Sequence, residues 1–395
     1  MIDLEQARQR LSGVVYKTPT VPARWLSDVV GGPVYLKCEN LQRTGSFKIR
    51  GAYNRIAGLN AQERAHGVVA ASAGNHEQGV ALAAALLDVP ATVFMPEGAS
   101  LPKIEATNAY GAQIVFAGST VDEALAAATE HSERTGAVLI HPFDHPDIVA
   151  GQATVGLEIV EQHPEVRTVV VCTGGGGLLA GVSLGVAQTD ATVIGVQASG
   201  AASYPASLSA GHPVALPQMH TLADGIAVAK PGQVDFDIIA AAGIEFLTVD
   251  DEQIARAVVT CLERSKQVVE PSGAAGMAAV LSDPGRFEPP VVITLSGGNV
   301  DPLLLLRIVQ RGLVASGRYV VLSGLIPDRP GALEHFLTQI AQHRGNVVTV
   351  THNRTNPLLA VNECAVVVEV EVRGPEHAAE ITAALRKVGF RVAAD

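Results

Sequence analysis

The residue best suited to covalent chemistry is Lys48, which lies in the segment Gly45–Ala52, GSFKIRGA. It follows a polar turn and the aromatic residue Phe47, and we predict that it begins a helix. The positive end of a helix dipole favours a neutral amine, and a neutral amine is the nucleophile that forms a Schiff base. Taken alone, Lys48 has an ordinary alternative as an exposed helix lysine, because buried lysines are uncommon.

A second candidate is the turn SAGNH, residues 72–76, between a predicted strand and a predicted helix. We expect Ser72 and Asn75 to cap this helix, whose free amides can hold an anion such as a carboxylate. Plain capping is the alternative interpretation. His76 is expected to be a hydrogen-bonded structural residue rather than a catalyst.

Four consecutive glycines, Gly174–Gly177, follow the predicted strand Thr168–Cys172 and precede Leu178. Consecutive glycines let backbone amides converge on a phosphate at a helix start. The same turn also fits part of a dinucleotide-binding pattern, but that pattern requires an acidic residue about 20 residues later. Gln197 stands at that place, which argues against a nicotinamide dinucleotide.

A third glycine-bearing turn, Ser296–Asn299, carries the sequence SGGN and by itself indicates only the end of a strand. All these turns lie between about residues 33 and 300, where Val/Ile-rich runs alternate with Ala-rich helical runs. This alternation predicts βαβ units and a mostly parallel sheet, in which ligands bind at the carboxyl ends of strands. The predicted strands are Val34–Cys38, Val68–Ser72, Thr92–Met95, Ala112–Phe116, Thr168–Cys172, Val193–Gln197 and Val291–Leu295. The predicted helices are Gly74–Leu87, Ser119–Arg134, Ile148–Gln162, Leu178–Ala187 and Asp250–Val268.

The pattern changes after a predicted helix at Asp301–Val314 and a linker at residues 316–317. A βαββαβ order in the remaining segment predicts a separate ferredoxin-like module over residues 318–395. We therefore place a catalytic domain over residues 1–316. The predicted elements of the module are, in order, Tyr319–Leu325, Gly331–Arg344, Val347–Arg354, Val361–Val372, Pro375–Lys387 and Phe390–Val392.

Composition narrows the class of protein. Hydrophobic residues make up 48% of the 395 residues and charged residues 17%, which is typical of a globular protein with a large core. The net charge of -11 and the lack of basic clusters argue against nucleic acid as a partner. No apolar run approaches the roughly 20 residues of a membrane span, and we expect a cytoplasmic protein with no secretory signal. The four cysteines are scattered, so we expect reduced thiols and no metal site.

In this order and spacing, TGSFKIRGA, SAGNH, GGGGL and SGGN resemble the motifs of the tryptophan-synthase-like (fold type II) pyridoxal-phosphate enzymes. Within that family, the match is to the threonine dehydratases (threonine ammonia-lyases), over nearly the whole chain. The resemblance implies an α/β catalytic domain of two open parallel-sheet subdomains, with the smaller one at roughly residues 50–150. It also implies pyridoxal 5'-phosphate as cofactor and a lyase that converts L-threonine to 2-oxobutanoate and ammonia, with L-serine as a second substrate.

The resemblance further implies a role for each matching residue. Lys48 would form the Schiff base and later remove the α-proton of the substrate, with Phe47 packed near the cofactor ring. Asn75 would bind the phenolic oxygen of the cofactor, and Ser296 would bind its pyridine nitrogen. The phosphate would be held by the amides of Gly174, Gly175, Gly176, Gly177 and Leu178. The substrate carboxylate would be received by Ser72, Ala73, Gly74, Asn75 and His76.

Two positions bear on the type of reaction. A neutral hydroxyl at Ser296 leaves the cofactor ring a weaker electron sink than a carboxylate would, which favours expulsion of a β-hydroxyl over transamination or racemisation. Serine racemases resemble this chain but carry a serine acid where Ala73 stands, and acidic metal ligands where Gln197–Ser203 contains none. Serine racemase and threo-3-hydroxyaspartate dehydratase are the nearest alternatives, and Glu270 is expected near the cofactor without contacting it.

Residues 318–395 resemble an ACT domain through GLIPDRPGALEHF, Gly324–Phe336. The resemblance implies that an amino-acid effector, isoleucine or valine, binds where Gly331 opens a helix. A purely assembling module is the alternative, and we expect a homodimer or homotetramer. An amino-acid sensor with a degenerate catalytic half, and a different family reaction such as threonine synthase or β-replacement, also remain open. The sequence does not decide between isoleucine biosynthesis and a catabolic role.

Overall fold

The structure is a computed structural model that describes residues 2–72, 74–99, 101–315, 317–355 and 359–394. The chain forms two compact units, Met1–Pro302 and Leu303–Asp395. The division falls at the start of helix α14 (Pro302–Ala315), whereas the sequence led us to group this helix with the catalytic domain. Within the described residues, no helix is both long enough and apolar enough to cross a bilayer.

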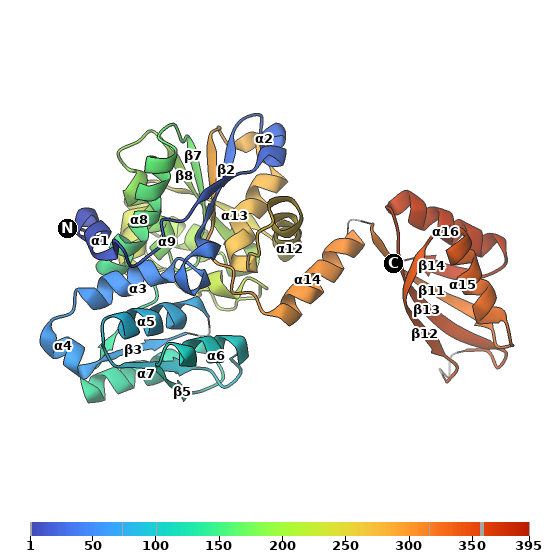
Figure 1. Ribbon diagram of the computed structural model, residues 1–395, viewed down its shortest axis with the longest axis horizontal. Coiled ribbons are helices and arrows are strands. Elements are labelled where there is room, and N and C mark those ends of the chain that lie inside the picture. The colour runs from blue at the N-terminus through green and yellow to red at the C-terminus, as the bar shows by residue number, and fades with distance from the viewer. Residues whose placement is uncertain (1, 73, 100, 316, 356–358, 395) are drawn as a thin grey trace. The chain divides into compact units, whose positions relative to one another are not determined.

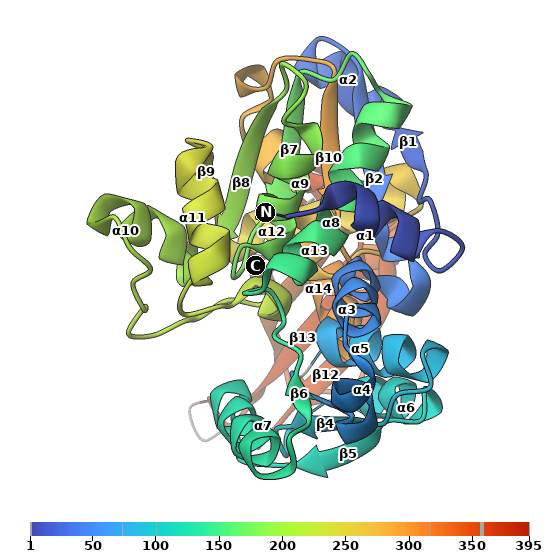
Figure 2. The same ribbon diagram turned by 90° about the vertical axis from the view of Figure 1, so that its left-hand side faces the viewer.

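The larger sheet of the first unit has the strand order β1-β2-β10-β7-β8-β9, which runs from right to left in Figure 2. All neighbours are parallel except the edge pair of β1 and β2, which is antiparallel. The central strands read TVVVC and VVITL and are buried along their full length, as expected for parallel strands covered on both faces. The strands are β1 (Thr20–Pro22), β2 (Val34–Cys38), β7 (Thr168–Cys172), β8 (Thr192–Ala198), β9 (Glu245–Val249) and β10 (Val291–Leu295).

Helices cover both faces of this sheet. Figure 1 shows α8 and α9 on one side of it and α12 and α13 on the other. The helices of this part are α1 (Leu4–Leu11), α2 (Arg24–Val30), α8 (Pro146–Gln162), α9 (Gly177–Val186), α10 (Ser203–Ala210), α11 (Gln233–Ala241), α12 (Asp251–Thr260) and α13 (Pro271–Ser282).

Helix α9 follows the four-glycine turn, and its position depends on a close approach to α8. A methyl group added to Gly185 would lie 2.4 Å from the carbonyl oxygen of Ala153, and one added to Gly181 would lie 2.7 Å from the Ala153 nitrogen. Larger side chains would separate the two helices, because interiors are close-packed. The small residues therefore fix where α9 begins relative to the sheet.

The smaller sheet has the order β5-β4-β3-β6 and is entirely parallel. Its central strand β3 alternates: Val68 and Ala70 pack toward α3 and α5, whereas Val69 and Ala71 pack toward α7. The strands are β3 (Val68–Ala71), β4 (Ala91–Met95), β5 (Gln113–Phe116) and β6 (Val138–Leu139). The helices are α3 (Lys48–Ala57), α4 (Ala61–His66), α5 (Asn75–Leu86), α6 (Leu101–Ala109) and α7 (Val121–Thr135).

The second unit has the βαββαβ order predicted from the sequence, with the antiparallel sheet order β12-β13-β11-β14. Helices α15 and α16 pack on this sheet through one core that includes Phe336, Ile381 and Val366. The elements after α14 are β11 (Tyr319–Pro327), α15 (Ala332–Gln342), β12 (Asn346–Asn353), β13 (Glu363–Glu371), α16 (Pro375–Lys387) and β14 (Arg391–Ala394).

The parallel α/β architecture was predicted correctly, but some elements were not. The short strands β1, β6 and β9 were missed, because two or three residues carry no periodicity and β9 mixes polar with apolar residues. The predicted helix Asp250–Val268 is too long. It leaves α-helical geometry after Thr260 and ends in a π-helical turn, Cys261–Ser265.

Candidate active site

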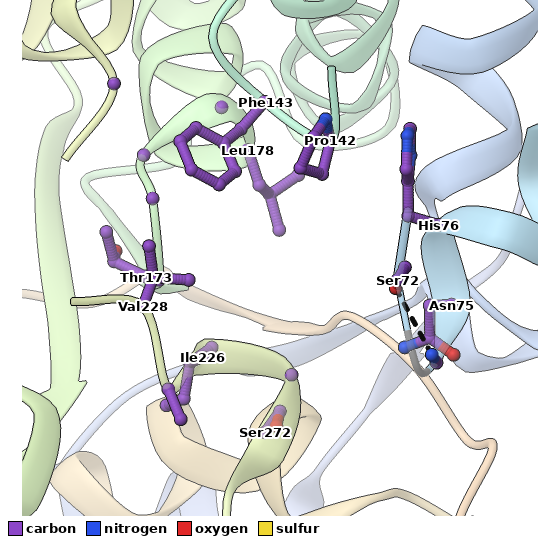
Figure 3. Close-up of a pocket in the computed structure, with 18 of the residues that line it drawn as sticks. Ser72, Asn75, His76, Pro142, Phe143, Thr173, Leu178, Ile226, Val228 and Ser272 are labelled. Atoms are coloured by element: carbon purple, nitrogen blue, oxygen red, sulfur yellow. Dashed lines mark hydrogen bonds between the residues drawn. The ribbon is translucent and has the colours of Figure 1, made fainter. Parts of the chain in front are cut away.

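A cavity of about 820 Å³ lies in the first unit, where turns after β3, β7 and β10 meet. Figure 3 shows Ser72, Asn75 and His76 on one side of it, with Thr173 and Val228 opposite. All the described residues predicted for the site line this cavity: Phe47, Lys48, Ser72, Gly74, Asn75, His76, Gly174, Gly175, Gly176, Gly177, Leu178 and Ser296. Ala73 was also predicted for the site, and it lies outside the described residues.

Lys48 is the first residue of α3 and is half-buried in the cavity wall. Its Nζ donates a hydrogen bond of 2.9 Å to the carbonyl oxygen of Pro142 and lies 5.2 Å from the centre of the Phe47 ring. Burial lowers the pKa of Lys48 to about 8, although nearby carboxylates, Asp235 foremost, act to raise it. A sizeable fraction of this amine is therefore neutral and nucleophilic in mildly alkaline solution.

The segment that carries Lys48 is joined to the SGGN turn through the backbone. Ser46 and Gly297 form an antiparallel β-bridge, and the Phe47 amide donates to the carbonyl oxygen of Ser296 at 3.1 Å. Segments far apart in the sequence are thus held in register, and the start of α3 is fixed relative to the end of β10.

The Ser296 hydroxyl is buried at the end of β10. It accepts a hydrogen bond of 3.1 Å from the Cys172 thiol. Burial raises the pKa of Cys172 to about 11, so this thiol stays protonated at neutral pH and can donate. Both members of the pair are uncharged, which suits Ser296 to a neutral heterocyclic nitrogen better than to a cation.

The four-glycine turn forms a cradle that side chains would fill. Gly176 caps α9 with a φ of 117°, in a region that favours glycine. A methyl group on Gly175 would lie 2.5 Å from ring atoms of Phe143. The first amides of a helix lack intrahelical acceptors, and here they border the cavity at the positive end of α9, which suits a phosphate.

The predicted capping of α5 by Ser72 and Asn75 is wrong. The N-cap of α5 is Gly74, which has no side-chain capping bond, and the Ser72 hydroxyl accepts from the Gly74 amide at 3.2 Å. The side chain of Asn75 is drawn away from the helix because it bonds to two distant residues. His76 is buried, and its Nε2 donates to the Ile140 carbonyl at 2.7 Å, as a structural histidine would.

Asn75 lies between Glu270 and Asn299. Its Nδ2 donates to Glu270 Oε1 at 2.6 Å, and its Oδ1 accepts from Asn299 Nδ2 at 2.8 Å. The same Nδ2 of Asn299 also donates a hydrogen bond of 2.7 Å to the carbonyl oxygen of Thr44. Burial raises the pKa of Glu270 to about 7, so this carboxyl is close to half-protonated at neutral pH. The network links the turns 72–76 and 296–299 directly.

Sequence reasoning missed several residues of the cavity. Phe143 packs against the glycine turn, and Lys103 pairs with Asp224 at 2.9 Å at the cavity wall. Phe143 lies in an irregular segment and Asp224 begins a short 3₁₀ turn, and no periodicity or motif marks either residue. Lys103 stands in the first turn of α6, where it reads as an ordinary helix lysine.

Comparisons with known proteins agree with this geometry. Residues 11–297 match the model of the family described as pyridoxal-phosphate dependent enzyme. The chain belongs to this family, and pyridoxal phosphate is its cofactor.

Three individual relatives are informative. The chain is 46% identical to an L-threonine ammonia-lyase of Thermotoga maritima over 99% of this chain and 98% of the relative. Its structure resembles threonine deaminase isoform 2 of Solanum lycopersicum, with a TM-score of 0.75 and 37% identity over 78% of this chain and 86% of that one. It also resembles maize serine racemase, with a TM-score of 0.73 and 35% identity over 79% of this chain and 97% of that one.

The residues of the cavity fit pyridoxal phosphate. A glycine cradle at a helix start suits its phosphate, the Lys48 amine suits its aldehyde, and the uncharged Ser296 hydroxyl suits its ring nitrogen. This fit rests on the chemistry of the donor set and on the space that the glycines leave.

Proposed function

We propose that this chain is an L-threonine ammonia-lyase, a carbon–nitrogen lyase that converts L-threonine to 2-oxobutanoate and ammonia and also accepts L-serine. The observation that carries the proposal is the 46% identity to an L-threonine ammonia-lyase over nearly the full length of both chains. The overall change is balanced: the β-hydroxyl and the α-proton leave as water, and water then releases the amino group as ammonia.

Pyridoxal phosphate, when bound, withdraws electrons from the α-carbon of the substrate and so weakens its C–H bond. Lys48 would hold the cofactor covalently, and its Nζ would later take the α-proton of the substrate. The pKa of Lys48, lowered by burial to about 8, makes a neutral amine available for this step in mildly alkaline solution.

The remaining residues hold the reacting groups in place. The amides of Gly174–Leu178 would bind the cofactor phosphate, and the Ser296 hydroxyl would bind the ring nitrogen. Phe47 would pack beside the ring, and Asn75, whose amide is oriented by Glu270, would bind the ring oxygen. The turn 72–76 receives the substrate carboxylate on its backbone amides.

Serine racemase is the second candidate, because maize serine racemase has a similar structure. Ala73 argues against it, since its methyl group cannot carry the proton that inversion requires on the opposite face. Racemases place acidic metal ligands in the stretch that matches Gln197–Ser203, which contains no Asp or Glu here. The side-chain oxygen of Gln197 accepts from the Tyr204 amide at 2.9 Å, an intramolecular role that needs no metal.

Purified protein incubated separately with L-threonine, L-serine and threo-3-hydroxyaspartate tests the assignment, with keto acid and D-serine as readouts. We expect keto acid from L-threonine and, more slowly, from L-serine. Keto acid from hydroxyaspartate alone, or D-serine from L-serine, would overturn the assignment. The Lys48→Ala variant is the matched inactive control.

For the second unit we propose an ACT domain that binds isoleucine or valine and thereby regulates the enzyme, within a homodimer or homotetramer. Its support is the βαββαβ fold and the turn before α15, where Gly331 caps the helix with a φ of 84°. A thermal-shift series of the full chain with isoleucine, valine, threonine and serine tests it. A true effector raises the melting temperature progressively with concentration, and a flat response to isoleucine and valine would refute this role.

A further inference from the structure

The side chain of Lys103 lies beside the turn proposed for the substrate carboxylate. A methyl group built on Gly74 would stand 3.5 Å from Lys103 Nζ, with no closer neighbour. Lys103 is in the first turn of α6, in the smaller subdomain, and its side chain is 14% exposed. Its Nζ pairs with Asp224 Oδ2 at 2.9 Å, and Asp224 belongs to a 3₁₀ turn of the larger subdomain.

The lysines among the described cavity-lining residues are Lys48, Lys103 and Lys230, and no arginine is among them. Lys48 faces the Pro142 carbonyl, where the cofactor aldehyde would meet it. Lys230 is exposed and lies two residues before Gly232, whose amide donates to the Gly175 carbonyl in the phosphate turn. Lys103 is therefore the cation at the carboxylate end of the cavity.

The surroundings of Lys103 keep it charged. Burial acts to lower the pKa of Lys103, whereas the carboxylates of Asp224, Glu77 and Glu270 act to raise it. The carboxylates together outweigh burial, so the pKa is raised. A buried ammonium needs a partner, because an unpaired buried charge is strongly unfavourable. Asp224 is that partner here, yet its own side chain is 61% exposed and would be solvated readily if released.

We propose that Lys103 Nζ binds the α-carboxylate of the amino-acid substrate, and that the substrate replaces Asp224 as its partner. The proposal rests on the proposed function, because it assigns the substrate carboxylate to the turn 72–76. It makes Lys103 a determinant of specificity for free amino acids over their amides and esters. Asp224 then acts as an internal competitor that keeps the ammonium paired before substrate arrives.

Binding of L-alanine and L-alaninamide to the cofactor-loaded protein tests the proposal. Neither ligand has a β-hydroxyl to lose, and binding is followed by the absorbance change of the bound cofactor. We expect Lys103→Gln to weaken L-alanine binding at least tenfold, or about 1.4 kcal/mol. Binding of L-alaninamide should change less than threefold. Lys103→Arg should retain most of the preference, and Lys230→Gln is the matched control that removes a cation from the other end of the cavity.

The competitor role has its own test. Asp224→Asn should strengthen L-alanine binding about threefold or more, because it removes the competing carboxylate. If Lys103→Gln fails to retain cofactor, this variant still tests whether the substrate replaces Asp224 beside Lys103. Equal weakening of both ligands in Lys103→Gln, loss of the preference in Lys230→Gln alone, or weaker L-alanine binding in Asp224→Asn would each overturn the proposal.

Kinetics with L-threonine separate this proposal from the proposed function. In Lys103→Gln the KM should rise at least tenfold while kcat changes less than threefold, because the contact is made in the bound substrate as well as in the transition state. If the wild-type protein forms no keto acid from L-threonine, the proposed function fails. The preference for L-alanine over its amide still tests Lys103 in that case.

Discussion

Asn75 and Glu270 are joined by a hydrogen bond of 2.6 Å, which connects the start of α5 in the smaller subdomain to the start of α13 in the larger one. The bond fixes the orientation of the Asn75 amide at the cavity. It also places a carboxyl group in an environment where its charge is costly, and this makes the Glu270 site sensitive to pH.

Glu270 should make the stability of the protein fall as pH rises toward neutrality. Its pKa is raised from 4.5 to about 7, so between these values the folded state holds a proton that the unfolded state has lost. The free energy of unfolding therefore decreases from about pH 4.5 to pH 7 and is level above that. In denaturant titrations at pH 5 and pH 8, Glu270→Gln should reduce this decrease by on the order of 2 kcal/mol. Glu130→Gln, an exposed control, should leave it unchanged.

Lys48 should control how fast cofactor-free protein recombines with pyridoxal phosphate. The neutral amine is the reactive form, and the pKa of Lys48 is lowered to about 8 by burial. The rate of recombination should therefore rise with pH, with a midpoint near 8, when followed by cofactor absorbance from pH 6.5 to 9.5. A rate independent of pH over this range would contradict the lowered pKa. Lys48→Ala should give no covalent adduct and lose at least about 1000-fold in activity.

Arg50, two residues after Lys48, should be important for stability. Its guanidinium is fully buried and contacts Glu39 at 2.8 Å and Glu158 at 2.7 Å, which ties α3 to the 3₁₀ turn Glu39–Leu41 after β2 and to α8. Arg50→Met removes the ion-pair partner of the fully buried Glu39, whereas Glu158 keeps Lys37 at 2.6 Å, and it should lower the free energy of unfolding by about 3–5 kcal/mol. Arg55→Met is the matched control in the same helix, since Arg55 pairs with the partly exposed Asp147 at 3.4 Å. It should cost less than about 1 kcal/mol, and similar losses in both variants would refute the argument.

Gly175→Ala should weaken cofactor binding by at least about tenfold. The added methyl group would press on the Phe143 ring and displace the turn whose amides we propose bind the phosphate. Equilibrium dialysis with pyridoxal phosphate measures the effect. The double variant Gly175→Ala with Phe143→Leu should recover part of the affinity, because the shorter side chain gives way. Gly98→Ala is the control, since an added methyl group there meets nothing within 4 Å.

Much of the architecture was accessible from the sequence because strong patterns produced it. The runs TVVVC and VVITL are typical of buried strands. The three glycine-bearing turns, at residues 72–76, 174–177 and 296–299, follow strand ends, where parallel sheets bind ligands. These turns do lie around one cavity. The roles assigned to their residues depend on the family resemblance and await the experiments above.

Other features could not be predicted because they depend on tertiary contacts. The local sequence around Asn75 predicts a helix cap. In the structure its side-chain amide is instead hydrogen-bonded to Glu270 and Asn299, which are distant in the sequence. Lys103 and Asp224 lie on different subdomains, and neither belongs to a motif. Their pairing follows from how two sheets meet, which one-dimensional periodicity does not encode.

The place of β10 in the larger sheet has a consequence for synthesis of the chain. This strand, Val291–Leu295, lies between β2 and β7, both of which leave the ribosome much earlier. The smaller sheet, by contrast, is complete once Leu139 has emerged. A nascent chain can therefore fold its smaller subdomain early, but β2 and β7 remain unjoined, with apolar edges exposed, until the last third of the polypeptide arrives. Chaperone demand should accordingly be greatest late in translation, shortly before the cofactor site closes.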